Sequence, residues 1–347
     1  MRDSTDFPGY RVVIVTLDAH AAGPVARVSE RLAEDFPGLH VSVHAAAEWA
    51  ENPDALIEAK AAVRTGDIIL SNLIFLEDQV QAILPVLRER RDQCDAMLGV
   101  IADTQLVNLT RMGDLDMSQP ASGAMAILKK LKPKTKSSSS AEASMKMLRR
   151  LPQILKFIPG KAQDLRAYFL TMQYWLGGSD DNVEQLIRFL VSRYAPNRKW
   201  TKVQAEAPVV YPEVGLYHPD LPGNGITTES SNLPAPDKPV ATVGLVMLRS
   251  YILASDTAHY DGVIRAFEAR GLRVIPAFAG GLDARPAIER YFKRDGYVVI
   301  DTMVSLTGFS LVGGPAYNDS AAAVTSLSDL DVPYIAAHSI EFQTLGQ

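Results

Sequence analysis

Short apolar runs alternate with segments of helical periodicity over the first hundred residues. The apolar runs, most of them ending in polar residues, predict strands over residues 12–20, 39–44, 68–76 and 96–104. The segments between them predict helices over residues 23–35, 52–64 and 77–92. Continuous apolar strands that alternate with helices are typical of a parallel sheet covered on both faces. The pattern therefore predicts a first α/β lobe over residues 1–128.

The same order of elements returns in the last third of the chain. The expected strands cover residues 243–251, 273–278, 296–306 and 333–339, and the expected helices cover residues 259–270 and 284–293. Residues 67–76 match residues 297–306 in pattern, and residues 36–43 resemble residues 269–277. We expect a second α/β lobe over residues 240–347 and an internal structural repeat. The alternative is that the match reflects only the similarity of all parallel strands.

The composition changes twice between the two lobes. Residues 129–144 are rich in lysine and serine and carry too little apolar material to pack, which predicts a flexible linker. A site for an acidic partner is the alternative for this charge run. Residues 145–200 show helical periodicity and predict a small helical insert. Residues 201–239 are rich in proline and predict an extended crossing to the second lobe.

The final apolar run, residues 332–336, predicts a buried strand that no further helix covers. We expect an exposed strand edge there, because the last unit of the second lobe is truncated. The chain is accordingly expected to be the front part of a longer protein.

Composition and charge narrow the classes of function. The single cysteine, Cys94, excludes an internal disulfide and favours a reducing compartment, which we expect to be the cytoplasm. No secretory signal and no apolar run long enough for a membrane span occur in the sequence. A net charge of −5 disfavours a nucleic-acid surface.

Polar residues at strand ends are the first candidates for a site, since ligands of open parallel sheets bind beyond the carboxyl ends of the strands. Capping of the following helix is the more frequent role of any one such residue. The candidates are Asp18, His20, Ser71, Asn72, Asp103, Thr104, Arg249, Ser250, Asp301, Thr302, His338 and Glu341.

Motifs for intrinsic catalysis are absent from the sequence. The Gly-rich stretch 311–320 lacks the spacing of a dinucleotide or P-loop motif, and residues 318–320 predict a helix cap there. No nucleophile elbow occurs, Cys94 has no activating neighbour in sequence, and the six histidines lack metal-ligand spacing. The aromatic residues of segment 168–175 fit a helix core better than a ligand platform. We predict no catalytic residue.

Several strings together resemble the family that contains the large, porphyrin-binding H subunit of magnesium chelatase and the large subunit of cobaltochelatase. These strings are SNLIFLEDQV, RERRDQCDAML, RMGDLDMSQ, LKKLKPK, the run from MLRRLPQILKFIPGK to SDDNVEQLIRFLVSRY, GFSLVGGPAYNDS and LDVPYIAAHSIEFQT. The resemblance follows nearly the whole chain in order, and members of the family are several times longer. It implies that the chain is an amino-terminal part of such a subunit.

The resemblance also implies an activity and its partners. That activity is insertion of Mg²⁺ into protoporphyrin IX during chlorophyll or bacteriochlorophyll biosynthesis, with ATP hydrolysed by the separate I and D motor subunits. The fragment alone is expected to be inactive, because the residues tied to metal insertion lie mostly beyond Gln347. Within the chain, Tyr317, Asn318, His338 and Glu341 are the residues expected to contact porphyrin. The alternatives are a cobaltochelatase subunit acting on a corrin precursor, and a two-lobed binding module for a small ligand.

Overall fold

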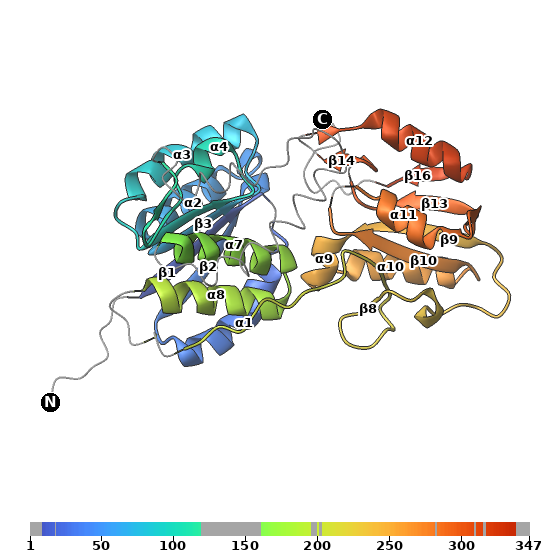
Figure 1. Cartoon of the computed structure of the whole chain (residues 1–347), viewed down its shortest axis with the longest axis horizontal. Coiled ribbons are helices and arrows are strands. Elements are labelled where there is room, and N and C mark those ends of the chain that lie inside the picture. Colours follow the sequence, from blue (N-terminus) through green and yellow to red (C-terminus); the bar gives the residue numbers. More distant parts are fainter. Residues whose placement is uncertain are drawn as a thin grey trace. The chain divides into compact units, whose positions relative to one another are not determined.

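The computed structural model describes residues 9–17, 19–118, 161–195, 200, 203–281, 283–308, 310–314 and 317–337. The chain divides into two compact units, Met1–Val209 and Val210–Gln347. Each unit contains one six-stranded, mostly parallel sheet (Figure 1). The α/β class and the two-lobed arrangement are therefore confirmed.

Unit 1 is built on a sheet of order β2-β1-β3-β4-β5-β6, with the first four strands parallel. Its strands are β1 (Tyr10–Thr16), β2 (Leu39–Ala45), β3 (Ile68–Asn72), β4 (Ala96–Val100), β5 (Arg111–Met112) and β6 (Leu115–Asp116). Its helices are α1 (Ala22–Asp35), η1 (Ala46–Ala50), α2 (Pro53–Thr65), α3 (Glu77–Arg90), α4 (Thr104–Val107), α7 (Lys161–Gly177) and α8 (Asp180–Tyr194). Pro53 opens α2, as the sequence predicts.

Helices cover both faces of this sheet (Figure 1). One face packs against α1, α7 and α8, and the other packs against α2 and α3. The predicted helices over residues 162–195 thus form part of the core of unit 1. The predicted linker, residues 129–144, and the predicted helix over residues 146–159 lie outside the described residues. The finer domain boundaries stay predictions.

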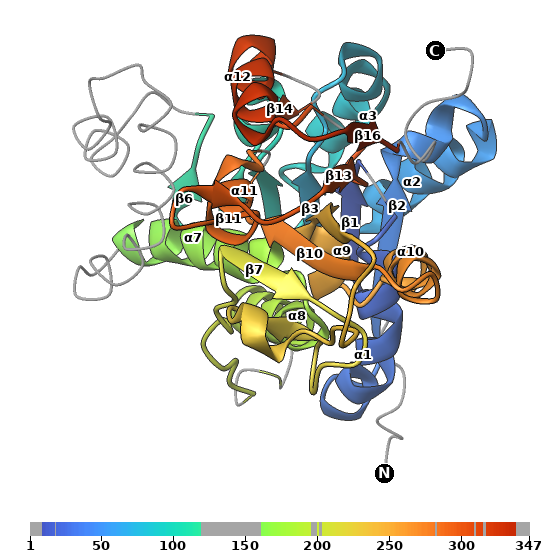
Figure 2. The ribbon, with the colours of Figure 1, turned by 90° about the vertical axis from the view of Figure 1, so that its right-hand side faces the viewer.

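Unit 2 is built on a sheet of order β16-β13-β9-β10-β7-β8. Figure 2 labels four of these strands, β16, β13, β10 and β7. Its sheet strands are β7 (Val214–Tyr217), β8 (Ile226–Thr227), β9 (Thr242–Leu248), β10 (Arg273–Ala279), β13 (Thr302–Ser305) and β16 (Tyr334–Ala336). Two hairpins join β11 (Lys293–Arg294) to β12 (Tyr297–Val298) and β14 (Gly313–Gly314) to β15 (Tyr317–Asn318). The helices are η3 (Ser230–Asn232), α9 (Arg249–Leu253), α10 (Ala258–Glu268), α11 (Arg285–Tyr291) and α12 (Ser320–Leu330).

The proline-rich segment differs in part from the expected crossing. It contains the short 3-10 helix η3 and two strands, of which β7 pairs antiparallel with β10 and β8 pairs antiparallel with β7. Neither strand contains a proline, so every residue of both strands keeps its backbone amide donor, and the prolines of the segment lie outside the paired stretches. At the opposite edge of the described sheet lies β16, as expected. The prediction that this strand is buried is wrong, because Tyr334 is only half-buried, Ile335 is 56% exposed and Ala336 is also exposed.

The two units repeat one design. The strands β2-β1-β3-β4 of unit 1 and β10-β9-β13-β16 of unit 2 have the same order and the same parallel pairing. In unit 1 the Asp67 carboxylate accepts a hydrogen bond from the Arg11 amide at 2.7 Å. In unit 2 the Asp301 carboxylate accepts one from the Thr242 amide at the same distance. These matching contacts make Asp67 the counterpart of Asp301.

This equivalence corrects the sequence match by four residues, because the sequence alone placed Asp67 opposite Tyr297. The single strand predicted over residues 296–306 is in fact two, since Tyr297 and Val298 turn back in the hairpin with β11. Asp301 and Thr302 therefore lie at the amino end of β13. They cannot belong to a ligand site at the carboxyl ends of the strands. Matching apolar patterns cannot distinguish between alignments of the two units that differ by a few residues. The aspartate before each strand does distinguish them.

Candidate functional site

The six-stranded sheets of unit 1 and unit 2 are called sheet 1 and sheet 2. The carboxyl edge of sheet 2 holds a small cavity where β9, β10 and β13 end. Its volume is about 20 Å³, enough for roughly one water molecule. The lining residues are Val246, Met247, Leu248, Ala279, Gly281, Ala284, Thr307, Ser310, Leu311 and Gly313. Because most of these side chains are apolar, the cavity suits an apolar group better than a charged one.

The hairpin beside this cavity contains two of the predicted porphyrin contacts. Tyr317 and Asn318 form β15 and pair with Gly314 and Gly313, the second of which lines the cavity. Asp319 caps α12 by accepting a hydrogen bond from the Ala322 amide at 2.9 Å. The predicted helix cap is thus confirmed. His338 and Glu341 lie outside the described residues, so contact with porphyrin stays a prediction for all four.

Arg249 and Ser250, also predicted as strand-end candidates, begin α9 directly after β9. The Arg249 guanidinium donates to the carbonyl oxygens of Pro212 at 2.9 Å and Tyr211 at 3.2 Å. Arg249 therefore holds the proline-rich segment in place, which is a structural role.

The carboxyl edge of sheet 1 is different in character, because it buries polar side chains. Thr16 ends β1 and is 1% exposed, and it pairs in register with Asn72, the last residue of β3, which is 0% exposed. Ser71, 1% exposed, precedes Asn72. Within the described part of the chain, the Thr16 and Ser71 hydroxyls and both polar atoms of the Asn72 amide have no hydrogen-bond partner. Buried polar groups are nearly always paired, so these four atoms set this edge apart from the rest of the sheet.

Ser71 and Asn72 were among the predicted strand-end candidates, whereas Thr16 was missed. Thr16 follows four apolar residues and reads as an ordinary strand residue; only its register with Asn72 shows its importance. His20 lies in the turn before α1, and Asp18 lies outside the described residues. Asp103 has the capping role, since its carboxylate accepts a hydrogen bond from the Gln105 amide at 2.8 Å at the start of α4, whose first residue is Thr104.

A second cavity lies in unit 1, where β2 ends, and has a volume of about 110 Å³. Its lining residues are Ala19, Ala22, Val43, His44, Ala45, Glu48, Ala55 and Glu58. Burial lowers the pKa of His44, and the carboxylates of Glu58 and Glu48 oppose that shift only in part. The described residues contain no group of three His, Cys, Asp or Glu side chains able to hold a metal ion.

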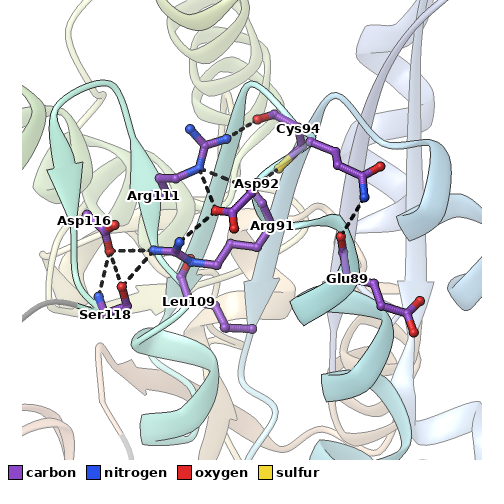
Figure 3. Close-up of polar contacts among 9 residues, drawn as sticks. Glu89, Arg91, Asp92, Cys94, Leu109, Arg111, Asp116 and Ser118 are labelled. Atoms are coloured by element: carbon purple, nitrogen blue, oxygen red, sulfur yellow. Dashed lines mark hydrogen bonds and ion pairs between the residues drawn. The ribbon is translucent and has the colours of Figure 1, made fainter.

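A polar network at the opposite, amino edge of β4 is structural (Figure 3). Arg91, at the end of α3, donates to the Asp116 carboxylate at 2.5 Å and to the Leu109 carbonyl at 3.0 Å, tying the helix to the β5–β6 hairpin. Arg111 donates to the carbonyl oxygens of Arg91 and Cys94. Burial raises the pKa of the Cys94 thiol, which disfavours the reactive thiolate. The expectation that Cys94 is not an activated nucleophile agrees with this environment.

The described helices include none that is both long enough and apolar enough to span a membrane.

The fold and the two sheet edges define a protein of two repeated parallel α/β units whose sequence lacks a P-loop motif. The profile of the CobN/magnesium chelatase family matches residues 172–347, and a domain of unknown function, DUF3479, matches residues 11–169. The chain belongs to the CobN/magnesium chelatase family.

Curated relatives agree with this assignment. The magnesium-chelatase H subunit from Cereibacter sphaeroides is 63% identical over 98% of this chain, and the match covers 28% of the relative. The H subunit from Rhodobacter capsulatus gives the same three values. The chloroplastic magnesium-chelatase subunit ChlH from Oryza sativa is 34% identical over 97% of the chain and 25% of its own length. The chain thus spans about a quarter of these relatives.

A solved structure titled as the catalytic subunit of cobaltochelatase from Mycobacterium tuberculosis is also similar, with 15% identity and a TM-score of 0.45. The match covers 95% of this chain and 21% of that one.

Proposed function

We propose that this chain is the amino-terminal part of the porphyrin-binding H subunit of magnesium chelatase. In this proposal the whole subunit binds protoporphyrin IX and takes part in Mg²⁺ insertion during chlorophyll or bacteriochlorophyll biosynthesis. The observation that supports it is the 63% identity to two bacterial H subunits over 98% of the chain. The rest of the subunit, beyond these 347 residues, would complete the site.

Mg²⁺ insertion is difficult for physical reasons. Mg²⁺ binds its waters tightly and prefers oxygen ligands, whereas a porphyrin offers four nitrogens in a rigid plane. External work is therefore expected, and this chain has no P-loop motif to supply it. ATP hydrolysis by the separate I and D motor subunits fits this division of labour. The complex would lie in the cytoplasm.

The predicted porphyrin contacts are Tyr317, Asn318, His338 and Glu341. Support comes from the β14–β15 hairpin, which borders the apolar cavity at the carboxyl edge of sheet 2. With a volume of about 20 Å³, that cavity cannot hold a macrocycle by itself. The proposal therefore assigns these residues to one wall of a cleft that the rest of the subunit closes.

The magnesium branch is preferred to the cobalt branch of the family. Two bacterial relatives with 63% identity are named as magnesium-chelatase H subunits, and a chloroplastic relative with 34% identity is named as subunit ChlH of the same enzyme. A self-contained binding module is a weaker proposal, because the relatives are several times longer than this chain.

Quenching of tryptophan fluorescence by deuteroporphyrin tests the proposal. Trp49, Trp175 and Trp200 are the three tryptophans of the chain. We expect saturable quenching of a full-length subunit that contains these 347 residues. Quenching of the chain by itself would place porphyrin contacts within it and would make Asn318→Ala the first variant to test. Absence of binding by the full-length subunit would contradict the proposal.

A further inference from the structure

Two polar residues at the carboxyl edge of sheet 1 gather at one place in the fold. Thr16 and Asn72 are register partners on adjacent parallel strands, so their side chains point to the same face of the sheet. That face is the one covered by α1, α7 and α8. The chain reverses its strand order between β1 and β3, which is where ligands of open parallel sheets bind.

The repeat shows that the fold does not need polar residues here. The counterparts of Thr16 and Asn72 in unit 2 are Met247 and Leu306, because Asp67 and Asp301 fix the alignment of the two units. Met247 belongs to a hydrophobic cluster of unit 2, and the partly buried Leu306 packs against that cluster. An apolar pair thus fills the same position in the same topology, so the fold itself does not require the polar pair of unit 1.

The loops that follow β3 and β4 at this edge each contain a residue with a positive φ, and hydrogen bonds join the two loops. Leu73 has a φ of 55° directly after β3, and Ile101 has a φ of 49° directly after β4. Bulky residues rarely adopt this left-handed conformation, and such strain collects at functional sites. The two loops hold each other through a hydrogen bond from the Leu73 amide to the Ile101 carbonyl at 2.9 Å. The Asp103 amide donates to the Ile74 carbonyl at the same distance.

The charge of the edge limits the ligand. Residues 19–22, 46–53, 73–78 and 101–104 are the described segments that follow or border the ends of the parallel strands. They contain five carboxylates, those of Glu48, Glu51, Glu77, Asp78 and Asp103, and no lysine or arginine. An anionic ligand would therefore be repelled. A buried amide whose donor and acceptor are both free of partners among the described residues is complementary to a group that presents an acceptor beside a donor.

We propose that Thr16 and Asn72 form a binding site for a small uncharged ligand that presents a hydrogen-bond donor next to an acceptor, as a carboxamide or an amino-heterocycle does. The Asn72 amide would pair with both groups of the ligand, and the Thr16 hydroxyl would add a third contact. Ser71 borders the site but points to the opposite face of the sheet. This site lies in unit 1 and does not depend on porphyrin binding, so its test is independent of the proposed function.

Nicotinamide and nicotinate are matched probes for this site. They differ only in that a carboxamide in the first is a carboxylate in the second. Ligand-observed saturation-transfer NMR on the 347-residue chain should show saturable binding of nicotinamide and none of nicotinate. Adenine, whose amino group lies beside a ring acceptor, is the second probe and should compete with nicotinamide.

The variants separate binding from folding. Asn72→Leu introduces the residue found at the matching position of unit 2 and should weaken nicotinamide binding about tenfold or more, since it removes two hydrogen bonds. Ser305→Ala, which changes a buried polar residue of unit 2, is the control and should leave binding unchanged. Circular dichroism shows whether each variant is folded.

Three outcomes would overturn the proposal. These are equal binding of nicotinate and nicotinamide, unchanged binding by a folded Asn72→Leu variant, and the absence of binding by both nicotinamide and adenine.

Discussion

Replacement of Thr16 by valine and Asn72 by leucine removes three buried polar atoms that have no partner among the described residues, with little change in side-chain volume. A buried donor or acceptor without a partner destabilises the folded state by about 1–3 kcal/mol. The same position in unit 2 is filled by the apolar side chains of Met247 and Leu306 within a hydrophobic cluster. The double variant should therefore fold normally.

The size of the effect follows from the individual groups. Asn72 contributes a donor and an acceptor with 0% exposure of the residue, and Thr16 contributes one hydroxyl at 1% exposure. If each residue relieves about 1 kcal/mol, at the low end of the range, the variant gains about 2 kcal/mol of unfolding free energy. Imperfect packing of the new side chains offsets part of this gain, so we expect a net stabilisation of about 1–2 kcal/mol.

Urea unfolding followed by tryptophan fluorescence measures this change in the correct unit, because all three tryptophans lie in unit 1. The midpoint should rise with no change in the denaturant slope. Ser305→Ala lies in unit 2 and should leave the transition where it is. Destabilisation of the double variant by more than about 1 kcal/mol would contradict this prediction, since it would mean that the polar groups have hydrogen-bond partners in solution.

Three other predictions concern unit 1. Asp164→Ala should lower the unfolding free energy of unit 1 by about 2–4 kcal/mol in the same urea assay. The reason is that the Asp164 carboxylate accepts hydrogen bonds from Arg193 at 2.9 Å, Tyr194 at 3.0 Å and the Asp114 amide at 2.9 Å. An effect below about 1 kcal/mol would contradict this prediction. Gly99→Ala should destabilise by about 1–3 kcal/mol or more, because a Cβ would meet the carbonyl carbon of Leu106 at 2.6 Å; a neutral effect in thermal unfolding would contradict this close contact. Burial by itself would raise the pKa of Asp116, but hydrogen bonds from Ser118 and the nearby Arg91 outweigh this effect, so the pKa is lowered. The contribution of Asp116 to stability is therefore present above the unfolded pKa of about 3.9. It is lost as the pH falls through the lower pKa of the folded state. Asp116→Asn should therefore flatten the acid limb of a stability profile, and an unchanged limb would show that the ion pair does not form.

The order of strands and helices could be predicted from the sequence, because parallel strands and their covering helices carry distinct apolar periods. The helices over residues 162–195 were predicted for the same reason. The register of the repeat could not be predicted. It is marked by one hydrogen bond in each unit, which a backbone amide donates to the carboxylate of the aspartate before the strand, and apolar patterns contain no trace of it.

The candidate site was predicted only in part. Ser71 and Asn72 stand out as polar residues at the end of an apolar run, whereas Thr16 looks like an ordinary strand residue. Its relevance depends on pairing with Asn72, far along the chain, and on the lack of a partner among the described residues, which are properties of the folded chain. The proline-rich segment was predicted as a crossing because antiparallel pairing at a sheet edge leaves no periodic signal in so short a strand.

A chimera can test whether this chain functions as part of a magnesium-chelatase H subunit. This chain would replace the matching part of the H subunit from Cereibacter sphaeroides, to which it is 63% identical, and the chimera would be combined with the motor subunits, ATP, Mg²⁺ and protoporphyrin IX. We expect formation of Mg-protoporphyrin, measured by its fluorescence, at a rate within about tenfold of the parent subunit, which corresponds to about 1.4 kcal/mol in the barrier. A chimera that folds and binds porphyrin but inserts no Mg²⁺ would contradict it.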